Sequence, residues 1–191
     1  MIKRIFDLVF SLFVIIFILS WLIPIIIIIT FISTGERPFY FQQRLGKKGI
    51  PFNIYKFRSM KGKPLINDPL LSIEESHRIT NFGKFLRKYR IDEFPQFMNV
   101  LKGEMSIVGP RPERQFFLDQ IITFIPQYKE LQKLRPGITS LGQIKYGYAD
   151  TIEQMKKRAR YDLLYLDNIS LWIDIKIIFA TLAVVFKGVG K

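Results

Sequence analysis

The 191-residue chain carries 29 lysine and arginine residues against 16 aspartate and glutamate residues, a formal net charge of +13. It contains no cysteine and one histidine, which excludes disulfides, thiolate metal sites, cysteine nucleophiles and multi-histidine metal sites. Any bound metal would therefore be held by oxygen, which favours Mg²⁺ or a similar hard cation. The positive charge indicates anionic partners such as lipid headgroups, nucleic acid or phosphate-rich metabolites.

An uncharged apolar run extends from residue 8 to residue 35. About 20 apolar residues can cross the hydrocarbon core of a bilayer, so a transmembrane helix is one interpretation. Pro24 interrupts the run, and the part before it would extend about 24 Å as a helix against about 30 Å of hydrocarbon. Positive residues flank the run on both sides, although they usually mark the cytoplasmic side alone. A re-entrant helix that breaks at Pro24 is therefore equally compatible with the residues.

The rest of the chain predicts mixed structure without internal repeats. Short strands are expected at residues 39–41 and 52–57, and a loop over residues 61–76. Helices are expected over residues 78–89, 95–102, 116–125 and 151–167. Residues 169–186 are apolar and flanked by lysine and aromatic residues, which favours an amphipathic helix in the membrane interface. The pattern predicts a helix-rich α+β fold with a small β element, a membrane-embedded segment at residues 1–35 and a domain at residues 36–191.

An acidic pair, Asp92 and Glu93, directly precedes the helix that Pro95 begins. Two carboxylates at this place would also complement the positive end of a helix dipole, by about 0.3–1 kcal/mol each. Adjacent residues diverge by about 100° in a regular helix, so a cooperating pair needs an irregular turn. The boundary at Pro95 offers such a turn.

Cations held by rigid backbone recur on both sides of this pair. Arg111 lies between two prolines, and its planar guanidinium suits phosphate oxygens. Arg135 precedes Pro136, while Lys56 and Arg58 project from one face of a predicted strand. Each feature alone is compatible with a solvated surface turn. Together they place a carboxylate pair among immobilised cations, which suits phosphoryl transfer better than proton transfer.

Several motifs follow one another in a fixed order: Lys56-Phe57-Arg58-Ser59-Met60, Asp92-Glu93-Phe94-Pro95-Gln96, Asn99-Val100-Leu101-Lys102-Gly103, Met105-Ser106, Val108-Gly109-Pro110-Arg111-Pro112 and Arg135-Pro136-Gly137-Ile138-Thr139. In this order and spacing the chain resembles the bacterial sugar transferases, the monotopic polyprenyl-phosphate phosphoglycosyl transferases. The resemblance covers essentially the whole chain and implies the minimal catalytic form of that family.

The resemblance implies an enzyme of the bacterial inner membrane, with its catalytic domain on the cytoplasmic face and its first helix re-entrant at Pro24. Members of the family transfer a sugar phosphate from a nucleoside-diphosphate sugar, usually a UDP-sugar, to undecaprenyl phosphate and release UMP. This is the first membrane step of surface glycan biosynthesis. The implied partners are the nucleoside-diphosphate sugar, polyprenyl phosphate and membrane lipids, without nucleic acid. The oligomeric state stays open, with a homo-oligomer as one alternative.

The resemblance also implies roles for individual residues. Asp92 would be the nucleophile that forms an aspartyl-phosphosugar intermediate. Glu93 would help to hold Mg²⁺, the implied cofactor. Phosphate-binding residues would be Arg111 and, as weaker candidates, Lys56, Arg58, Arg87 and Arg135. Asp162 and Asp174 would be structural or supporting residues.

Two stretches depart from the family pattern. Ile23, instead of the usual serine, precedes Pro24. The family sequence Gly-Trp-Ala-Gln-Val-Asn-Gly-Arg is replaced here by a stretch at residues 140–148 that ends in Lys145-Tyr146-Gly147-Tyr148. The final arginine of the family motif is missing, and Lys145 is one candidate substitute.

Two other functions are compatible with the charge. A non-catalytic membrane module could bind anionic lipid or another glycan-assembly enzyme without any use of Asp92. Nucleic-acid binding is a third interpretation, but the sequence has no recognisable nucleic-acid-binding motif and the membrane segment argues against it.

Overall fold

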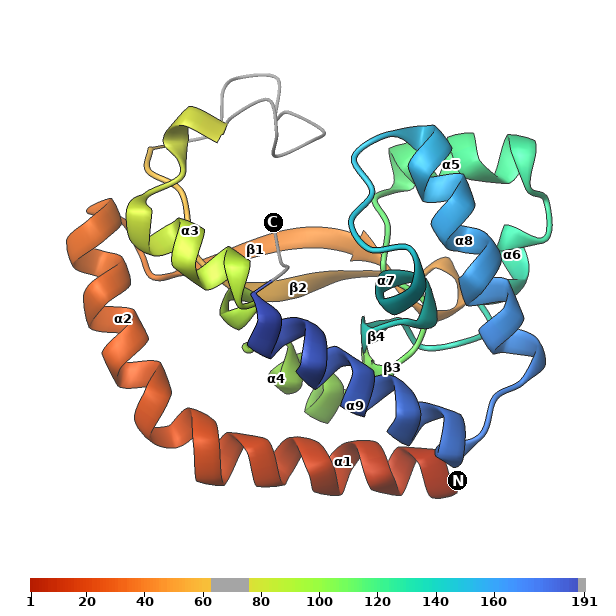
Figure 1. The fold of residues 1–191 in the computed structure, drawn as a ribbon, viewed down its shortest axis with the longest axis horizontal. Helices are drawn as coiled ribbons and strands as arrows, with labels where there is room; N and C mark the ends of the chain where they lie inside the picture. Colours follow the sequence, from red (N-terminus) through yellow and green to blue (C-terminus); the bar gives the residue numbers. More distant parts are fainter. Residues whose placement is uncertain (63–75, 189–191) are drawn as a thin grey trace.

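A bent helical arm wraps around a helix-rich domain in the computed structural model, which describes residues 1–62 and 76–188 (Figure 1). The arm consists of α1 (Ile2–Val14), a π-helical turn (Ile15–Leu19) and α2 (Ser20–Thr34). It is long and apolar enough to cross a membrane by length and composition. The loop expected at residues 61–76 lies almost entirely outside the described residues.

The bend of the arm lies around the π-helical turn, ahead of the proline (Figure 1). Pro24 stays inside α2, so the helix is bent before this residue and is not broken at it. A helix can kink at a proline, which cannot donate a backbone hydrogen bond, or at a π-helical turn. The expected bend is therefore present, with a different local cause from the expected one.

Polar residues of α1 hold it along the domain. Asp7 is 2 % exposed and accepts hydrogen bonds from the Ser106 hydroxyl at 2.7 Å and the Ile107 N–H at 3.1 Å. Arg4 donates to the Val100 carbonyl at 2.8 Å. Large apolar residues of the arm remain exposed, among them Val9, Phe13, Phe17, Trp21, Ile28 and Ile32. The arm thus contacts the domain through polar residues and through apolar ones such as Phe10 and the buried Ile26, and it has an apolar outer surface.

Two small sheets lie inside the domain. β1 (Phe39–Leu45) and β2 (Pro51–Phe57) form an antiparallel hairpin whose register runs from Phe39 opposite Phe57 to Leu45 opposite Pro51. Both predicted strands are confirmed and are longer than expected at one end. β3 (Ser106–Val108) and β4 (Gly137–Thr139) pair in parallel and were not expected, because three residues are too few for a periodic signal.

The predicted helices are confirmed, with boundaries shifted by a few residues. They are α3 (Asn81–Lys88), α4 (Gln96–Lys102), α5 (Gln115–Phe124), α8 (Ile152–Asp167) and α9 (Leu171–Lys187), joined by the short helices α6 (Tyr128–Leu131) and α7 (Leu141–Lys145). Thr151 and Gln154 form a capping box at α8, and Gly103 ends α4 at φ +87°. The described residues therefore form a helix-rich α+β fold.

The last long helix, α9, has two different sides. Asp174 is fully buried, where it accepts hydrogen bonds from Lys3 and from the Tyr165 hydroxyl, both at 2.6 Å. Trp172, Phe179 and Phe186, at intervals of seven residues, are 65 %, 67 % and 81 % exposed. This exposed stripe agrees with an interfacial helix, and the placement of α9 in a membrane stays a prediction.

The contact between Asp7 and β3 should be necessary for stability. Asp7→Ala leaves the Ser106 hydroxyl and the Ile107 N–H buried without an acceptor, so we expect a loss of about 1–3 kcal/mol in the free energy of unfolding. Urea unfolding in one fixed detergent measures this loss. Asp119→Ala is the matched control, since Asp119 is exposed and, among the described residues, its only side-chain hydrogen bond is the one it accepts from Gln115 of its own helix. Equal losses for both variants would contradict the prediction.

Candidate functional site

The Asp92–Glu93 pair lies on the irregular turn between α3 and α4. Arg90 has φ +57°, an unusual value for a residue with a side chain, and it redirects the chain at the end of α3. A 3₁₀ turn (Ile91–Glu93) follows, and Pro95 is the N-cap of α4. Asp92 is 9 % exposed and Glu93 is 5 % exposed. The irregular turn that a cooperating pair requires is therefore present.

Three cations surround the Glu93 carboxylate. Its Oε1 accepts hydrogen bonds from Lys56 Nζ at 2.8 Å and from an Arg111 guanidinium nitrogen at 3.1 Å. Its Oε2 lies 3.8 Å from an Arg90 guanidinium nitrogen. Burial alone would raise the pKa of Glu93, but Lys56, Arg111 and Arg90 together hold it well below its usual value. Glu93 is therefore a fixed anion at the centre of a cation cluster.

Asp92 has different surroundings, although it is the next residue in the chain. Burial raises its pKa, and the negative charge of Glu93 adds to this rise, while Lys56, Arg87 and Arg90 oppose it. Within the described part of the chain, its carboxylate has no hydrogen-bond or ion-pair partner. The Glu93 carboxylate is thus hydrogen-bonded to cations. The Asp92 carboxylate is buried close to cations but forms no hydrogen bond with them in the ranges that the structure describes.

Arg111 contacts Glu93 from a turn that is itself bound to α8 through two buried residues of that helix, Arg158 and Asp162. Glu113 forms an ion pair with Arg158 of α8, and both residues are buried. Asp162, one helical turn further along α8, accepts hydrogen bonds from the Gly142 N–H at 2.8 Å, the Ser140 side chain and the Arg111 backbone. Burial lowers the pKa of Arg111, but Glu93 and Glu113 outweigh burial and raise it above its usual value. The arginine between the two prolines is therefore oriented by buried side chains.

Close packing between α7 and α8 explains Gly142. A Cβ atom at this position would lie 2.7 Å from Arg158 Cγ and 2.9 Å from Asp162 Oδ1. Any side chain here would push α8 away from the turn that carries Arg111. Asn99 makes a similar connection between α4 and β2, since its amide accepts from the Tyr55 N–H at 3.1 Å and donates to the Asn53 carbonyl at 2.7 Å. These contacts hold Lys56 and the carboxylate pair in one place.

The structure brings together some of the predicted phosphate-binding residues. Lys56 and Arg111 contact Glu93, and the charge of Arg87 acts on Asp92 while its Nε donates to Ser59 at 2.8 Å. Arg58 instead donates to the Arg37 carbonyl at 2.8 Å. Arg135 donates to the Gly103 carbonyl at 2.8 Å. The contacts of Arg58 and Arg135 within the described residues therefore lie outside the Glu93 cluster, and their substrate roles stay predictions.

Two residues near the pair, Arg90 and Tyr148, and one near Arg111, Arg44, were missed from the sequence. Arg90 stands two residues before Asp92, but only the structure reveals its left-handed backbone and its approach to Glu93. Arg44 lies close enough to Arg111 and Arg114 that burial and these charges lower its pKa to about 10. Tyr148 belongs to the stretch that departs from the family motif, and its ring centroid lies 6.0 Å from Arg90 Cζ. The motifs gave no signal for either Arg44 or Tyr148, because Arg44 precedes the first motif and Tyr148 lies in the stretch that departs from the family pattern.

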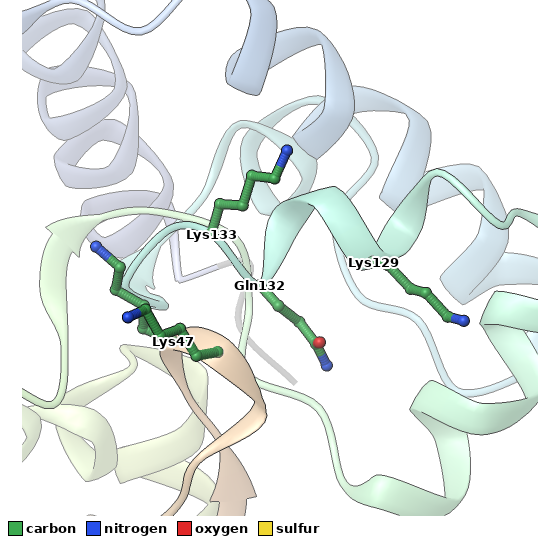
Figure 2. A pocket seen from close by; sticks show the side chains of 5 residues that line it. Lys47, Lys129, Gln132 and Lys133 are labelled. Atoms are coloured by element: carbon green, nitrogen blue, oxygen red, sulfur yellow. The ribbon is translucent and has the colours of Figure 1, made fainter.

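A separate cavity of about 400 Å³ lies between the β1–β2 turn and the α6 region, lined by Lys47, Lys48, Lys129, Gln132 and Lys133 (Figure 2). The side chains of Lys129 and Lys133 extend in different directions in this view. The lining contains no carboxylate and none of the predicted site residues. Its charge suits an anion, but the chemistry predicted from the sequence resides at the Asp92–Glu93 turn.

The carboxylate pair fits a Mg²⁺ ion that takes most of its ligands from substrate and water. No cluster of three or more aspartate, glutamate, histidine or cysteine side chains suited to a metal occurs within residues 1–62 and 76–188. Mg²⁺ commonly uses one or two carboxylates together with substrate phosphates and retained waters, so a full protein cage is unnecessary. Asp92 and Glu93 carry carboxylate oxygens of the kind that such a site would use.

Asp162 should produce a measurable pH dependence of stability. Burial raises its pKa from 3.8 to about 6, so between about pH 4 and pH 6 the folded protein binds more protons than the unfolded chain. Stability should therefore fall as the pH rises through this window, by at most about 3 kcal/mol from this group. Asp162→Asn cannot titrate. The difference in unfolding free energy between wild type and Asp162→Asn should decrease from pH 4 to pH 6, and a constant difference would contradict the prediction.

Comparison with known proteins adds an independent result. The profile of the family described as "Bacterial sugar transferase" matches residues 1–188. The chain is 42 % identical, over 97 % of its length, to the UDP-glucose:undecaprenyl-phosphate glucose-1-phosphate transferase of Klebsiella pneumoniae, of which the match covers 40 %. It is 42 % identical, over 79 % of its length, to the UDP-N-acetylgalactosamine-undecaprenyl-phosphate N-acetylgalactosaminephosphotransferase of Aeromonas hydrophila, of which 36 % is covered.

A further relative is similar in length. The chain is 36 % identical, over 98 % of its length, to the uncharacterized sugar transferase EpsL of Bacillus subtilis, of which 89 % is covered. By contrast, the chain spans about two fifths of the Klebsiella and Aeromonas relatives. The family profile nevertheless extends from the bent arm to the end of α9 and includes the Asp92–Glu93 turn. The chain belongs to the bacterial sugar transferase family.

Proposed function

We propose that the protein transfers a sugar phosphate from a UDP-sugar to undecaprenyl phosphate and releases UMP, through a covalent aspartyl-phosphosugar intermediate. The observation that carries the proposal is the asymmetry of the carboxylate pair. Glu93 is held by Lys56 and Arg111, whereas the neighbouring Asp92 is buried near cations without a partner of its own. The names of the Klebsiella and Aeromonas relatives, which join a UDP-sugar with undecaprenyl phosphate, support the choice of substrates.

The proposed reaction has two displacement steps at one phosphorus atom. A carboxylate oxygen of Asp92 attacks the sugar-linked β-phosphorus of the donor, the bond from this phosphorus to the bridging oxygen breaks, and UMP leaves with the electron pair. A phosphate oxygen of undecaprenyl phosphate then attacks the same phosphorus. The bond to Asp92 breaks, the carboxylate is regenerated, and the lipid-diphosphosugar is released. A soluble donor and a lipid acceptor can thus use one site in turn.

The surrounding cations suit this chemistry. Asp92 must approach a diphosphate that repels it, and fixed positive charges lower the energy of such an encounter. Lys56 and Arg111 already converge on one oxygen of Glu93, so an incoming diphosphate can compete for the same two donors. This competition would release Glu93 Oε1 from its present partners. The attacking form of Asp92 is the carboxylate, which Lys56, Arg87 and Arg90 favour against the effect of burial.

We assign the metal dependence of this reaction to Mg²⁺, with Glu93 as its main protein ligand. When bound, the ion would neutralise part of the negative charge of the diphosphate. The residues of the chain would bind the phosphates, exclude water around Asp92 and orient the donor.

The bent arm would place this site at the cytoplasmic face of the bacterial inner membrane. α1 is tied to α9 by Lys3 and to β3 by Asp7, so its start cannot leave the domain without breaking buried polar contacts. A straight helix through the bilayer would separate these groups or pull the domain into the hydrocarbon, where buried charge is costly. A re-entrant arm avoids both, since it keeps the two flanks of the apolar run on one side.

The nucleophile assignment predicts the effect of one substitution. Asp92→Asn keeps the size of the side chain but removes the attacking carboxylate, so we expect UMP release to fall by at least about 10³-fold. The assay contains purified protein, Mg²⁺, undecaprenyl phosphate and a panel of UDP-sugars. Asp119→Asn is a matched control on the exposed side of α5 and should keep wild-type turnover. Retention of full turnover by Asp92→Asn would refute the nucleophile assignment while the activity itself stood.

Two further readouts of this assay test the rest of the proposal. Trapping with a donor labelled in its sugar phosphate, without lipid acceptor, should label wild-type protein and leave Asp92→Asn unlabelled. EDTA should stop UMP release, and excess Mg²⁺ should restore it. The absence of UMP release with every UDP-sugar, from protein shown to be folded, would reject the proposed function and favour a non-catalytic membrane module.

The arm geometry predicts the sidedness of its two ends. The chain has no cysteine, so single cysteines can be introduced without removing native ones. Ile2→Cys and Arg37→Cys place a thiol at exposed positions at either end of the apolar run, and neither substitution disturbs the Lys3–Asp174 ion pair. A membrane-impermeant thiol reagent should label both in inside-out vesicles and neither in intact spheroplasts. Labelling from opposite sides would overturn the re-entrant arrangement and leave the enzyme assignment intact.

A further inference from the structure

Tyr148 is presented to the site by a short irregular segment between α7 and α8. Tyr146 packs against the cluster formed by α5, α6 and α8, and Ala149 is 6 % exposed in the same cluster. Gly147 between them has φ +92°, a conformation that L side chains rarely adopt. Tyr148 is therefore flanked by the partly buried Tyr146 and the buried Ala149, while Tyr148 itself is 39 % exposed.

The ring of Tyr148 borders the cation cluster around Glu93. Its centroid lies 6.0 Å from Arg90 Cζ, and Arg90 in turn lies 3.8 Å from Glu93 Oε2. Tyr148 is also close enough to Arg111 to influence the pKa of that guanidinium. Lys145, the other candidate for the missing arginine of the family motif, is exposed and has no contact with Glu93, Arg90 or Arg111 among the described residues. Of the two, Tyr148 is thus the residue that lies beside the cation cluster around Glu93.

We propose that Tyr148 binds the donor by stacking on its uracil base, an inference that rests on the proposed function. The sugar-linked phosphate must reach Asp92, which is buried, and the base is the end of the nucleotide remote from that phosphate. The base therefore occupies the exposed rim of the site, where Tyr148 lies. A tyrosine ring offers a flat apolar face to a base, and its contact with Arg90 restrains its orientation.

The size of the effect follows from known stacking contacts. Loss of one base–aromatic stack weakens nucleotide binding by about 5- to 100-fold. Tyr148→Phe keeps the ring and should stay within about threefold of wild type, whereas Tyr148→Ala removes the ring and should show the full effect. A phosphate contact would give a different pattern, because it would not depend on the base.

Binding of two probes to the full-length protein in detergent distinguishes these patterns. UMP carries the base, and ribose 5-phosphate is the same molecule without it. We expect Tyr148→Ala to weaken UMP binding by about 5- to 100-fold and ribose 5-phosphate binding by no more than about twofold. Lys145→Ala, a substitution in the same stretch, should leave both affinities unchanged. Thermal melting of each variant at one detergent concentration checks that the fold is retained.

Other outcomes overturn the inference. Equal weakening of both probes by Tyr148→Ala would assign the residue to the phosphate side of the site, and an unchanged UMP affinity would remove it from the donor site. Loss of UMP affinity in Lys145→Ala but not in Tyr148→Ala would transfer the role to Lys145. The proposed function is judged separately, by UMP release from the wild-type protein. If wild type releases UMP and Tyr148→Ala binds UMP normally, the inference about Tyr148 fails and the proposed function stands. If UMP binding depends on Tyr148 but no UDP-sugar is turned over, the contact with the uracil base stands and the proposed function is rejected.

Discussion

Burial of two adjacent carboxylates is the constraint on which the arrangement of this protein depends. A buried carboxylate without compensation is strongly disfavoured and would take up a proton. Lys56, Arg90 and Arg111 compensate Glu93 directly and come from three different parts of the chain: β2, the end of α3 and the turn before α5. The carboxylate pair can therefore be buried only where these three parts meet, and the fold of the domain must hold them together.

Buried polar contacts provide that support at a distance from the pair. Asn99 joins α4 to β2, while Arg158 and Asp162 of α8 hold the turn that carries Arg111. Such contacts are weak evidence for overall stability, since burying polar groups is costly in itself. Their directional hydrogen bonds do, however, restrict the orientation of Arg111 and Lys56. A site that binds a diphosphate by fixed charges needs this restriction more than it needs additional charge.

Buried polar contacts also fix the position of the bent arm relative to the domain. An apolar helix could be attached to a domain by a flexible linker, and the height of the site above the bilayer would then vary. Here Lys3 and Asp7 of α1 are joined to α9 and β3, and β3 directly precedes the turn with Arg111. The arm and the site are thus parts of one packed unit. For a lipid acceptor whose phosphate lies at the headgroup level, this rigidity would hold Asp92 at a constant depth.

The sequence by itself determined the fold class, the helices with clear periodicity, the hairpin strands and the irregular turn at Asp92–Glu93. These features depend on local patterns: apolar spacing, caps such as Thr151 and Gly103, and motifs of contiguous residues. The parallel pair of β3 and β4 escaped prediction because three-residue strands have no period of their own. The cause of the bend in the arm was also missed, since a proline was visible in the sequence and a π-helical turn was not.

Only the tertiary structure decided which cations serve the carboxylate pair. Lys56 and Arg58 are equivalent as members of one motif, yet Lys56 contacts Glu93 while Arg58 binds the Arg37 carbonyl. Arg90 and Tyr148 join the site because of a left-handed residue and a glycine at φ +92°, neither of which a motif records. The physical reason is that charge compensation acts through space over a few ångströms. The chain order shows which charges are available, and packing selects those that come close enough to act.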